Sequence, residues 1–188
     1  MKLILASSNK HKADELKDFF KETQIEIESA PEKLEVIEDG KSFEENAFKK
    51  AQAYYEKFKR PVLSDDSGLV LECRDDILGI YSARFVPEFP DYKDKCSELI
   101  KILSDEQNRN AYFICVLCVY ISPEEVYFFE GRLVGKIGTE LKGSNGFGYD
   151  PVFFPNKLGG ESIAENPGWK ALNSHRAKAL QQLIKFFD

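Results

Sequence analysis

Long apolar stretches and an excess of positive charge are both missing from this sequence of 188 residues. No apolar stretch approaches the roughly 20 residues that a membrane-spanning helix needs, so we expect no membrane partner. Lys and Arg number 26 against 32 Asp and Glu, and the net charge is −6. A broad nucleic-acid surface needs clustered basic residues in excess, so we expect no nucleic-acid partner either. A small anion held by a few local cations is compatible with this balance.

Histidine and cysteine are also scarce, with two and four residues. Cys115 and Cys118 lie in an apolar run, and positions three apart in a strand point to opposite faces. No second pair completes a zinc site, so we interpret the cysteines as core thiols. The N-terminal residues 1–6 form a short apolar run that turns polar at once, unlike a signal peptide. We therefore expect a cytoplasmic protein.

The apolar content of 43% is enough for a real core, and we expect one domain over residues 1–188. The periodicity predicts strands at 2–6, 25–27 and from 61, and a hairpin of 111–121 with 126–137. A further short apolar run covers 152–154. Helices are predicted around Leu16 to Phe20, from Ser42 to about Phe58, near 91–103 and over 174–187. Ser42 and Glu45 fit a capping box. Interleaved helices and strands favour an α/β fold with a mixed sheet.

Two adjacent carboxylates stand out in the segment Ser64-Asp65-Asp66-Ser67-Gly68. We expect a turn here that Ser67 and Gly68 close. Adjacent carboxylates repel, so a fold that aims both at one place needs a cation there or must leave one of them protonated. One interpretation is therefore a Mg²⁺ site that handles phosphate. The other is a solvated acidic turn.

The loop after the first predicted strand reads Ser7-Ser8-Asn9-Lys10-His11-Lys12. A helix start favours an anion, because its N–H groups are free and its dipole is positive there. The serines and Asn9 can donate to phosphate while the lysines supply charge. The alternative is an ordinary helix cap with two solvated lysines.

A glycine–aromatic loop follows the hairpin, with the sequence Gly143-Ser144-Asn145-Gly146-Phe147-Gly148-Tyr149-Asp150. Glycines allow a close approach of the backbone to a ligand. Phe147 and Tyr149 offer faces on which a base can stack, and Asp150 can accept hydrogen bonds. The alternative is a tight turn with its aromatic rings in the core.

The last helix begins near Ser174-His175-Arg176, with Lys170 shortly before it. Ser174 suits a helix cap, and His175 and Arg176 would project from the first turn. Both could instead be ordinary exposed residues. Taken together, the acidic pair, the cationic segments and the aromatic loop suit a nucleoside triphosphate better than a sugar or a protein partner.

In this order the motifs resemble the inosine triphosphate pyrophosphatase family, the Ham1-like nucleotide hydrolases. The matching segments span nearly the whole chain: Ser7-Ser8-Asn9-Lys10-His11-Lys12, Ser42-Phe43-Glu44-Glu45-Asn46-Ala47, Ser64-Asp65-Asp66-Ser67-Gly68-Leu69, Gly79-Ile80-Tyr81-Ser82-Ala83-Arg84-Phe85, Gly146-Phe147-Gly148-Tyr149-Asp150-Pro151 and Ser174-His175-Arg176.

The resemblance implies Mg²⁺-dependent hydrolysis of inosine, deoxyinosine and xanthosine triphosphates to the monophosphate and pyrophosphate. It implies an elongated mixed sheet flanked by helices, two lobes with a central nucleotide-binding cleft, and a homodimer. It assigns Asp66 as proton acceptor and metal ligand, with Asp65 beside it. Residues 7–12, Ser67 and Lys170 would contact the nucleotide, and Phe147, Gly148, Tyr149, Asp150, His175 and Arg176 would frame the base.

The chain departs from the family pattern in two places. Ile37 replaces the first acid of a pair in which a glutamate binds metal, so Glu38 becomes the candidate ligand, with Asp65 or Glu45 as a further one. Residues 164–170 are also less acidic than is usual before the lysine. Two alternatives to this activity are a nucleotide-binding sensor without catalysis and a related hydrolase for modified pyrimidine nucleotides.

Overall fold

The computed structural model describes residues 1–7, 9–21 and 23–187. The strands are β1 (Lys2–Ala6), β2 (Glu26–Ser29), β3 (Val62–Leu71), β4 (Asn110–Ser122), β5 (Glu125–Ile137) and β6 (Phe153–Pro155). The α-helices are α1 (Lys10–Phe20), α2 (Phe43–Phe58), α3 (Tyr92–Ile102), α4 (Pro167–Asn173) and α5 (His175–Phe187). Short 3-10 helices are η1 (Gly79–Arg84), η2 (Asp150–Val152), η3 (Asn156–Leu158) and η4 (Ile163–Glu165).

The six strands form one mixed sheet in the order β2-β1-β3-β4-β5-β6. Strand β1 pairs in parallel with both β2 and β3, whereas β6 is antiparallel to β5. Two residues separate β4 from its neighbour β5, and so short a link joins antiparallel strands. The predicted hairpin and the mixed α/β sheet are thus confirmed.

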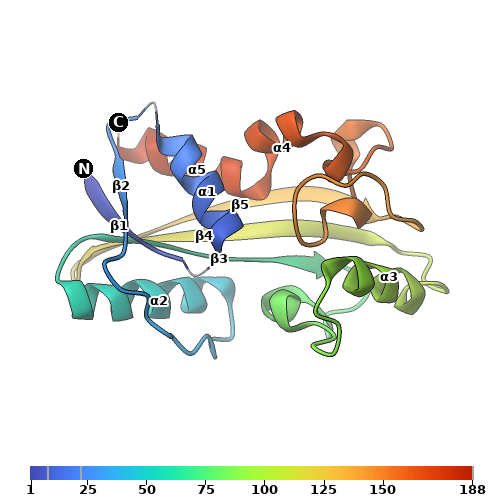
Figure 1. The fold of residues 1–188 in the computed structure, drawn as a ribbon, viewed down its shortest axis with the longest axis horizontal. Helices are drawn as coiled ribbons and strands as arrows, with labels where there is room; N and C mark the ends of the chain where they lie inside the picture. Colours follow the sequence, from blue (N-terminus) through green and yellow to red (C-terminus); the bar gives the residue numbers. More distant parts are fainter. Residues whose placement is uncertain (8, 22, 188) are drawn as a thin grey trace. The chain divides into compact units, whose positions relative to one another are not determined.

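The chain folds into two compact units. Unit 1 comprises residues 1–67, 115–131 and 175–188, and unit 2 comprises residues 68–114 and 132–174. Strands β3, β4 and β5 contribute residues to both units. Within unit 1, Figure 1 shows α1 and α5 on one side of the strands and α2 on the other.

Strand alternation builds two separate cores in unit 1. Leu3 and Leu5 pack with α1 and α5, whereas Ile4 and Ala6 pack with α2. The same alternation in β4 sends Cys115 to the first core and Cys118 to the second. Both thiols are free and buried, as the sequence predicted. Alternate apolar residues of one strand therefore serve both faces of the sheet.

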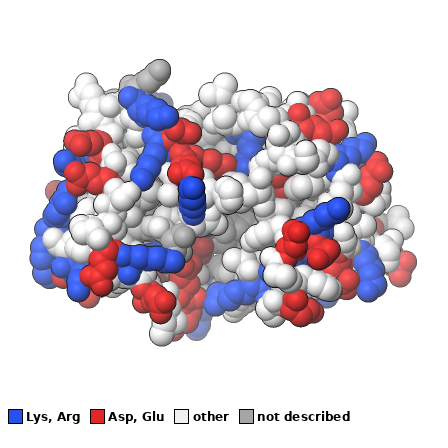
Figure 2. All heavy atoms as spheres, viewed as in Figure 1, with Lys and Arg blue, Asp and Glu red and all other residues white. Residues whose placement is uncertain are grey.

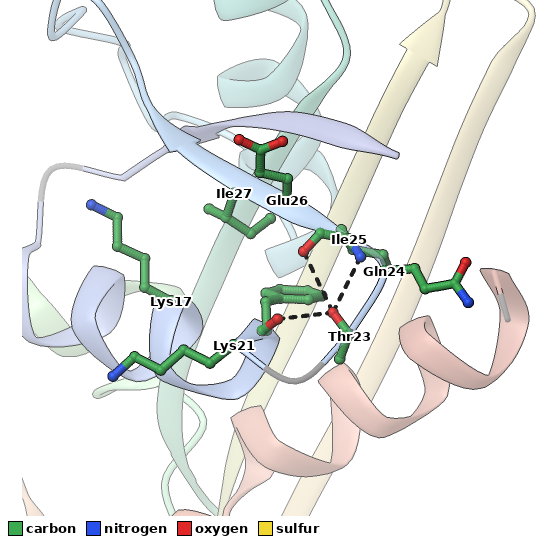
Figure 3. A pocket seen from close by; sticks show the side chains of 8 residues that line it. Lys17, Lys21, Thr23, Gln24, Ile25, Glu26 and Ile27 are labelled. Carbon is green, nitrogen blue, oxygen red and sulfur yellow. Dashed lines mark hydrogen bonds between the residues drawn. The ribbon is translucent and has the colours of Figure 1, made fainter.

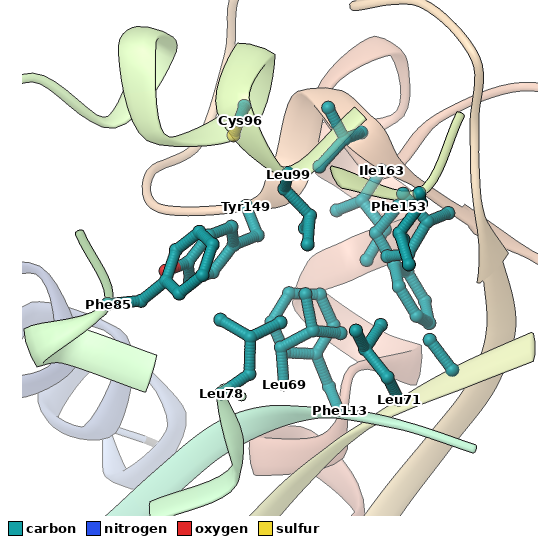
Figure 4. Close-up of a cluster of buried hydrophobic side chains, with 14 of the residues drawn as sticks. Leu69, Leu71, Leu78, Phe85, Cys96, Leu99, Phe113, Tyr149, Phe153 and Ile163 are labelled. Carbon is teal, nitrogen blue, oxygen red and sulfur yellow. The ribbon is translucent and has the colours of Figure 1, made fainter. Parts of the chain in front are cut away.

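Unit 2 has one core, in which α3 and the residues flanking η1, Leu78 and Phe85, pack on the remaining parts of the long strands. Figure 4 shows this cluster, which includes Leu69 of β3, Leu99 of α3, Phe113 of β4 and Phe153 of β6. Tyr149, from the glycine–aromatic loop, lies among these side chains. The loop is therefore anchored in the core of its own unit.

Helix α2 begins at the predicted cap, because the Ser42 hydroxyl accepts the Glu45 N–H at 3.1 Å. The reciprocal bond of the predicted capping box differs, since the Glu45 carboxylate accepts the N–H of Lys41 at 2.7 Å rather than that of Ser42. Among the described residues, no helix combines the length and the apolar character needed to cross a membrane.

Candidate active site

The acidic pair lies in a strand rather than in the expected turn. Strand β3 runs without a break through Asp65, Asp66, Ser67 and Gly68. The pairing of β1 with β3 ends where Ala6 faces Ser64, so the two aspartates continue beyond the carboxyl end of β1. The Ser-Gly signal for a turn was wrong here, because sheet formation overrides local preference. Carboxyl ends of parallel strands are a common place for ligand sites in α/β proteins.

Because they are neighbours in a strand, the two carboxylates point to opposite faces. Asp65 and Ser67 share one face, and both approach the guanidinium of Arg176 in α5, at 3.7 and 3.1 Å. Asp66 points to the other face, where it accepts a hydrogen bond from Asn46 of α2 at 3.1 Å. The predicted convergence of both carboxylates on one ligand is therefore replaced by two different environments.

Asp65 is an anion held between cations. Its Oδ2 lies 3.1 Å from the Lys12 ammonium, and the side chain is almost completely buried. Burial alone would raise its pKa, but the charges of Lys12, Arg176 and Lys50 outweigh that cost and hold the pKa well below its usual range. Asp65 thus serves to fix Lys12 and Arg176 in place.

Asp66 has the opposite character. Burial raises its pKa to about 6, against the pull of Lys12 and Lys50 and with a contribution from the charge of Glu38. Its Oδ1 accepts the Ser67 N–H at 2.9 Å. A carboxylate with a pKa near neutral is suited to accept and release a proton at physiological pH.

Asn46 connects Asp66 to the acidic loop. Its side chain donates to Asp66, and its Oδ1 accepts the N–H of Gly40 at 2.8 Å. A Cβ at Gly40 would lie 2.6 Å from Asn46 Oδ1 and 2.8 Å from Glu45 Cβ, so only glycine fits there. The loop that carries Glu38 is therefore drawn tightly against the start of α2.

Lys50 is a functional candidate that the sequence reasoning missed. Its side chain is only 12% exposed and lies 3.1 Å from the Glu38 carboxylate. Although burial opposes its charged form, the charges of Asp65, Glu38 and Asp66 raise the pKa of Lys50. One signal was available, since Lys50 is four residues after Asn46 and four-residue spacing places both on one face of α2.

The cationic loop contributes mainly through Lys12. Asn9 caps α1 by accepting the Lys12 N–H at 3.2 Å, and the Ser7 hydroxyl donates to the Asn9 carbonyl at 3.4 Å. Lys10 and His11 are exposed at the start of α1. Ser8, also predicted to bind substrate, lies outside the described residues.

His175 and Arg176 occupy the first turn of α5 as predicted, but both are buried. The Arg176 guanidinium forms an ion pair with Glu15 of α1 in addition to its contacts with Asp65 and Ser67. Arg176 thus connects α5 to α1 and to β3. Glu15 was not predicted, because its position on α1 is typical of a solvated residue.

The second set of predicted residues lies in unit 2, around the buried carboxylate of Asp150. Its Oδ2 accepts the Phe147 N–H at 2.9 Å and the Lys170 ammonium at 2.8 Å. The same ammonium lies 4.2 Å from the centre of the Phe147 ring, a cation–π contact. A Cβ at Gly146 would lie 2.1 Å from Asp150 Oδ2, and the residue has φ +80°. These contacts fix the loop's shape.

Tyr149 and Gly148 are held by contacts with α3 and η1. The Tyr149 ring is buried and stands edge-on to Tyr92, and its hydroxyl donates to the Ser82 carbonyl at 2.7 Å. Cys96 donates to the Gly148 carbonyl at 3.6 Å. Of the two aromatic residues predicted to stack on a base, Tyr149 is thus engaged in the core of unit 2, whereas Phe147 is half-buried.

The surface charge is mixed. On the face shown in Figure 2, basic and acidic side chains of the described residues are interspersed, and neither sign forms a broad patch. Figure 3 shows a pocket of about 310 Å³ in unit 1 beside α1 and β2. It contains no predicted site residue, and its Thr23 hydroxyl is bonded to the backbone of Phe20 and Ile25.

The residues around Asp66 suit a magnesium ion in part. Among the described residues, no group of three or more His, Cys, Asp and Glu side chains is placed to hold a metal. Mg²⁺ commonly takes only one or two carboxylates and completes its shell with water and phosphate oxygens. The burial of Asp66 and its repulsion from Glu38 are both costs that a cation would relieve. Asp65 does not fit, because its Oδ2 is already paired with Lys12 and Arg176.

A mixed sheet with lysines and buried carboxylates at a strand end defines an α/β protein equipped to handle phosphate groups. Residues 3–186 match the Ham1 family, and the chain belongs to that family. It is 40% identical over 193 residues to a dITP/XTP pyrophosphatase of Aquifex aeolicus, covering 98% of this chain and 95% of that protein. A dITP/XTP pyrophosphatase of a Thermoanaerobacter species is 42% identical, with 99% and 96% covered.

Solved structures agree with this membership. The Staphylococcus aureus Ham1 protein has a TM-score of 0.88 and 32% identity, with 100% of this chain and 98% of that one covered. A nucleoside-triphosphatase, or dITP/XTP pyrophosphatase, from Mycobacterium abscessus has a TM-score of 0.78 and 37% identity, with 98% and 99% covered. The predicted family and fold class are confirmed.

Proposed function

We propose that this protein hydrolyses non-standard purine nucleoside triphosphates, such as ITP, dITP and XTP, to the monophosphate and pyrophosphate. The observation that carries the proposal is the cluster of Asp66, Lys12 and Lys50 at the end of β1. It occurs in a chain similar over its whole length to proteins named dITP/XTP pyrophosphatase. This reaction would remove damaged nucleotides from the cellular pool.

In this proposal Asp66 accepts a proton from the attacking water. Burial raises its pKa to about 6 in the metal-free protein, so it is mainly ionised at neutral pH and can orient the water and take its proton. Lys12 and Lys50 would offset charge on the triphosphate, Lys50 by exchanging the Glu38 carboxylate for a phosphate oxygen. Phosphoryl transfer depends mainly on such positioning and charge stabilisation. Arg176 is buried and contacts Ser67, Asp65 and Glu15, so we assign it the role of holding these residues in place.

We further propose that the reaction depends on Mg²⁺, which Asp66 and Glu38 would hold. When bound, the ion would polarise phosphate oxygens and acidify a bound water. The ion pair of Glu38 with Lys50 keeps that carboxylate available near Asp66 until the ion arrives. Removal of divalent cations with a chelator should therefore abolish turnover, and Mg²⁺ should restore it.

Recognition of the base is assigned to the loop of unit 2. Donors there would face the 6-oxo group of hypoxanthine or xanthine, which the 6-amino group of adenine cannot satisfy. An unpaired buried donor costs about 1–3 kcal/mol, enough for one or two powers of ten in selectivity. The cation–π contact of Lys170 with Phe147 supports this assignment, because it brings an ammonium donor next to a ring face.

The test is release of pyrophosphate from a panel of nucleotides. The purified protein with Mg²⁺ should release pyrophosphate, and no orthophosphate, from ITP and XTP much faster than from ATP or GTP. Asp66→Asn should abolish turnover, whereas Asp76→Asn, at an exposed ion pair with Arg74, should keep it. Full activity in Asp66→Asn would overturn the mechanism.

The same panel separates the alternative functions. Tight binding of ITP without pyrophosphate release would identify a sensor, and preference for modified pyrimidine triphosphates would identify a different hydrolase. We also propose a homodimer that acts in the cytoplasm, on the strength of the family resemblance. Light scattering coupled to size-exclusion chromatography measures the mass directly, and a mass near 21.5 kDa would refute the dimer.

A further inference from the structure

Lys95 is a buried lysine in α3 that the proposed chemistry does not use. The residue is 6% exposed. Its ammonium donates to the carbonyl oxygens of Phe85 at 2.8 Å and Ala83 at 3.3 Å, and lies 5.5 Å from the centre of the Tyr92 ring. Within the described chain its partners are therefore backbone carbonyls and a ring face. Burial of an ammonium without a carboxylate partner costs free energy, so we asked which contacts of the fold depend on Lys95.

Ala83 lies in the last turn of η1 and Phe85 directly follows that helix. The carbonyl of Ser82, the residue just before Ala83, accepts the Tyr149 hydroxyl at 2.7 Å. The Ser82 hydroxyl accepts the Leu69 N–H at 2.9 Å and donates to the Gly79 carbonyl at 2.6 Å. Strand β3 thus fixes one side of η1, and Lys95 fixes its last residues.

The next residue of α3 contacts the same loop directly. The Cys96 thiol donates to the Gly148 carbonyl at 3.6 Å, and Tyr92, one turn earlier, packs edge-on against Tyr149 with ring centres 5.4 Å apart. Figure 4 shows Tyr149 beside Phe85, whose own carbonyl is held by Lys95. Helix α3 and η1 therefore both contact the loop of residues 146–150, through Gly148 and Tyr149.

We propose that Lys95 is a positioning residue for base recognition, acting through η1 and the bond from Tyr149 to Ser82. It would fix the position of the loop that carries Phe147 and Asp150, without touching the nucleotide. The inference rests on the proposed function for the identity of the ligand. The mechanical part, that Lys95 orders residues 146–150, stands independently of that function.

The first experiment measures the loop without any nucleotide. Lys95→Met removes the ammonium and keeps a long apolar side chain, and Lys93→Met, at an exposed position of the same helix, is the matched control. Hydrogen exchange of peptides covering residues 143–152 should be faster by about tenfold in Lys95→Met, the effect of one lost buried hydrogen bond. Exchange at the control rate would overturn the inference. This result does not depend on hydrolytic activity.

The second experiment separates positioning from general destabilisation. Lys95→Met should raise the KM for ITP about tenfold and change kcat less than about twofold. Tyr149→Phe keeps the ring and removes only the hydroxyl that reaches Ser82, so it should raise KM in the same way. If both act through one link, the double variant will have no higher KM than the worse single variant.

Effects of the two substitutions on KM that multiply would overturn the shared link, as would an equal loss in kcat. Wild-type protein that releases no pyrophosphate from ITP would refute the proposed function alone, because the exchange experiment still decides whether Lys95 orders the loop.

Discussion

At the scale of single residues, chemical identity matters less than which face of β3 a side chain occupies. Asp65 and Asp66 are the same amino acid in the same strand, yet cations hold the pKa of Asp65 far down while burial lifts that of Asp66 to about 6. The first keeps Lys12 and Arg176 in place, and the second is left able to exchange a proton. When their environments push the pKa values of two carboxylates apart, the two groups can take different roles in acid–base chemistry.

The raised pKa of Asp66 predicts a pH-dependent cost in stability. The folded state holds this proton more tightly than the unfolded chain, so the contribution of Asp66 to stability is greatest below the ordinary value of 3.8 and falls as pH rises to about 6. Asn does not titrate. In chelated buffer, Asp66→Asn should therefore gain up to about 3 kcal/mol on wild type between pH 3.5 and 7.5. Urea unfolding across that range measures the difference, and a gap independent of pH would contradict the assignment.

Two adjacent lysines of α2 offer a matched pair for testing charge at the site. Lys50 is half-buried beside Glu38, whereas Lys49 pairs with Asp39 at the surface. Lys50→Met should lower kcat/KM for ITP by about 10- to 100-fold, the value of one charged hydrogen bond, and Lys49→Met should change it less than twofold. Similar losses in both variants would show that only the net charge of the helix matters.

At the scale of elements, the site depends on how closely α5 approaches β5. A Cβ added at Gly131 of β5 would lie 2.0 Å from the His175 carbonyl and 2.6 Å from the Ala179 nitrogen. Such distances cannot be met without movement of the backbone. The glycine therefore allows the first turn of α5, with Arg176, to reach β3 and α1.

Gly131→Ala should push that turn outward. We expect a loss of at least about 2 kcal/mol in stability, in the upper range for overpacking, and a lower kcat/KM because Arg176 would leave Ser67 and Asp65. Gly168→Ala is the control, because a Cβ there meets no atom within 4 Å. Thermal unfolding and pyrophosphate release measure both effects. Wild-type stability in Gly131→Ala would mean that α5 is free to shift.

The elements show where sequence reasoning succeeds. Periodicity placed β1, α2, the β4–β5 hairpin and α5, because each buries one repeating face and that face is visible in the pattern. The Ser67-Gly68 turn was wrong, because a strand with partners continues through residues that would bend an isolated chain. Helix α4 and η1 escaped prediction, since elements this short are stabilised by contacts such as those of Ser82 rather than by periodicity.

For the site, sequence reasoning found residue types but not their partners. Asp66, Lys12 and Arg176 were predicted from their residue types and lie close together in unit 1, and their binding roles stay predictions. Lys50 and Lys95 were missed because a lysine on a helix is ordinarily solvated. Only the packing of distant segments reveals that these two are enclosed, and no local pattern carries that information.

At the scale of the whole molecule, the single domain predicted from chain length corresponds to two compact units with shared strands. Because β3, β4 and β5 each supply residues to both units, loss of one unit would remove strand partners from the other. We therefore expect both units to unfold together, as a small single domain does.

The chain carries a natural probe in each unit for this test. Trp169, the single tryptophan, lies in unit 2, and the buried thiols of Cys115 and Cys118 lie in unit 1. Tryptophan fluorescence and thiol labelling, followed in a Cys73→Ser and Cys96→Ala background, should give the same urea midpoint. Midpoints separated by more than about 0.5 M, well beyond ordinary fitting error, would show two domains.

The shared strands also have a consequence for inheritance. The chain passes from one unit to the other after Ser67, Ile114, Gly131 and Ser174, and the first three of these points lie inside strands. Recombination that exchanged unit 2 between two relatives would need crossovers at all four points at once. Three of them would join strand halves from different proteins. The two units are therefore expected to descend as one block, with new substrate preferences arising by point substitution.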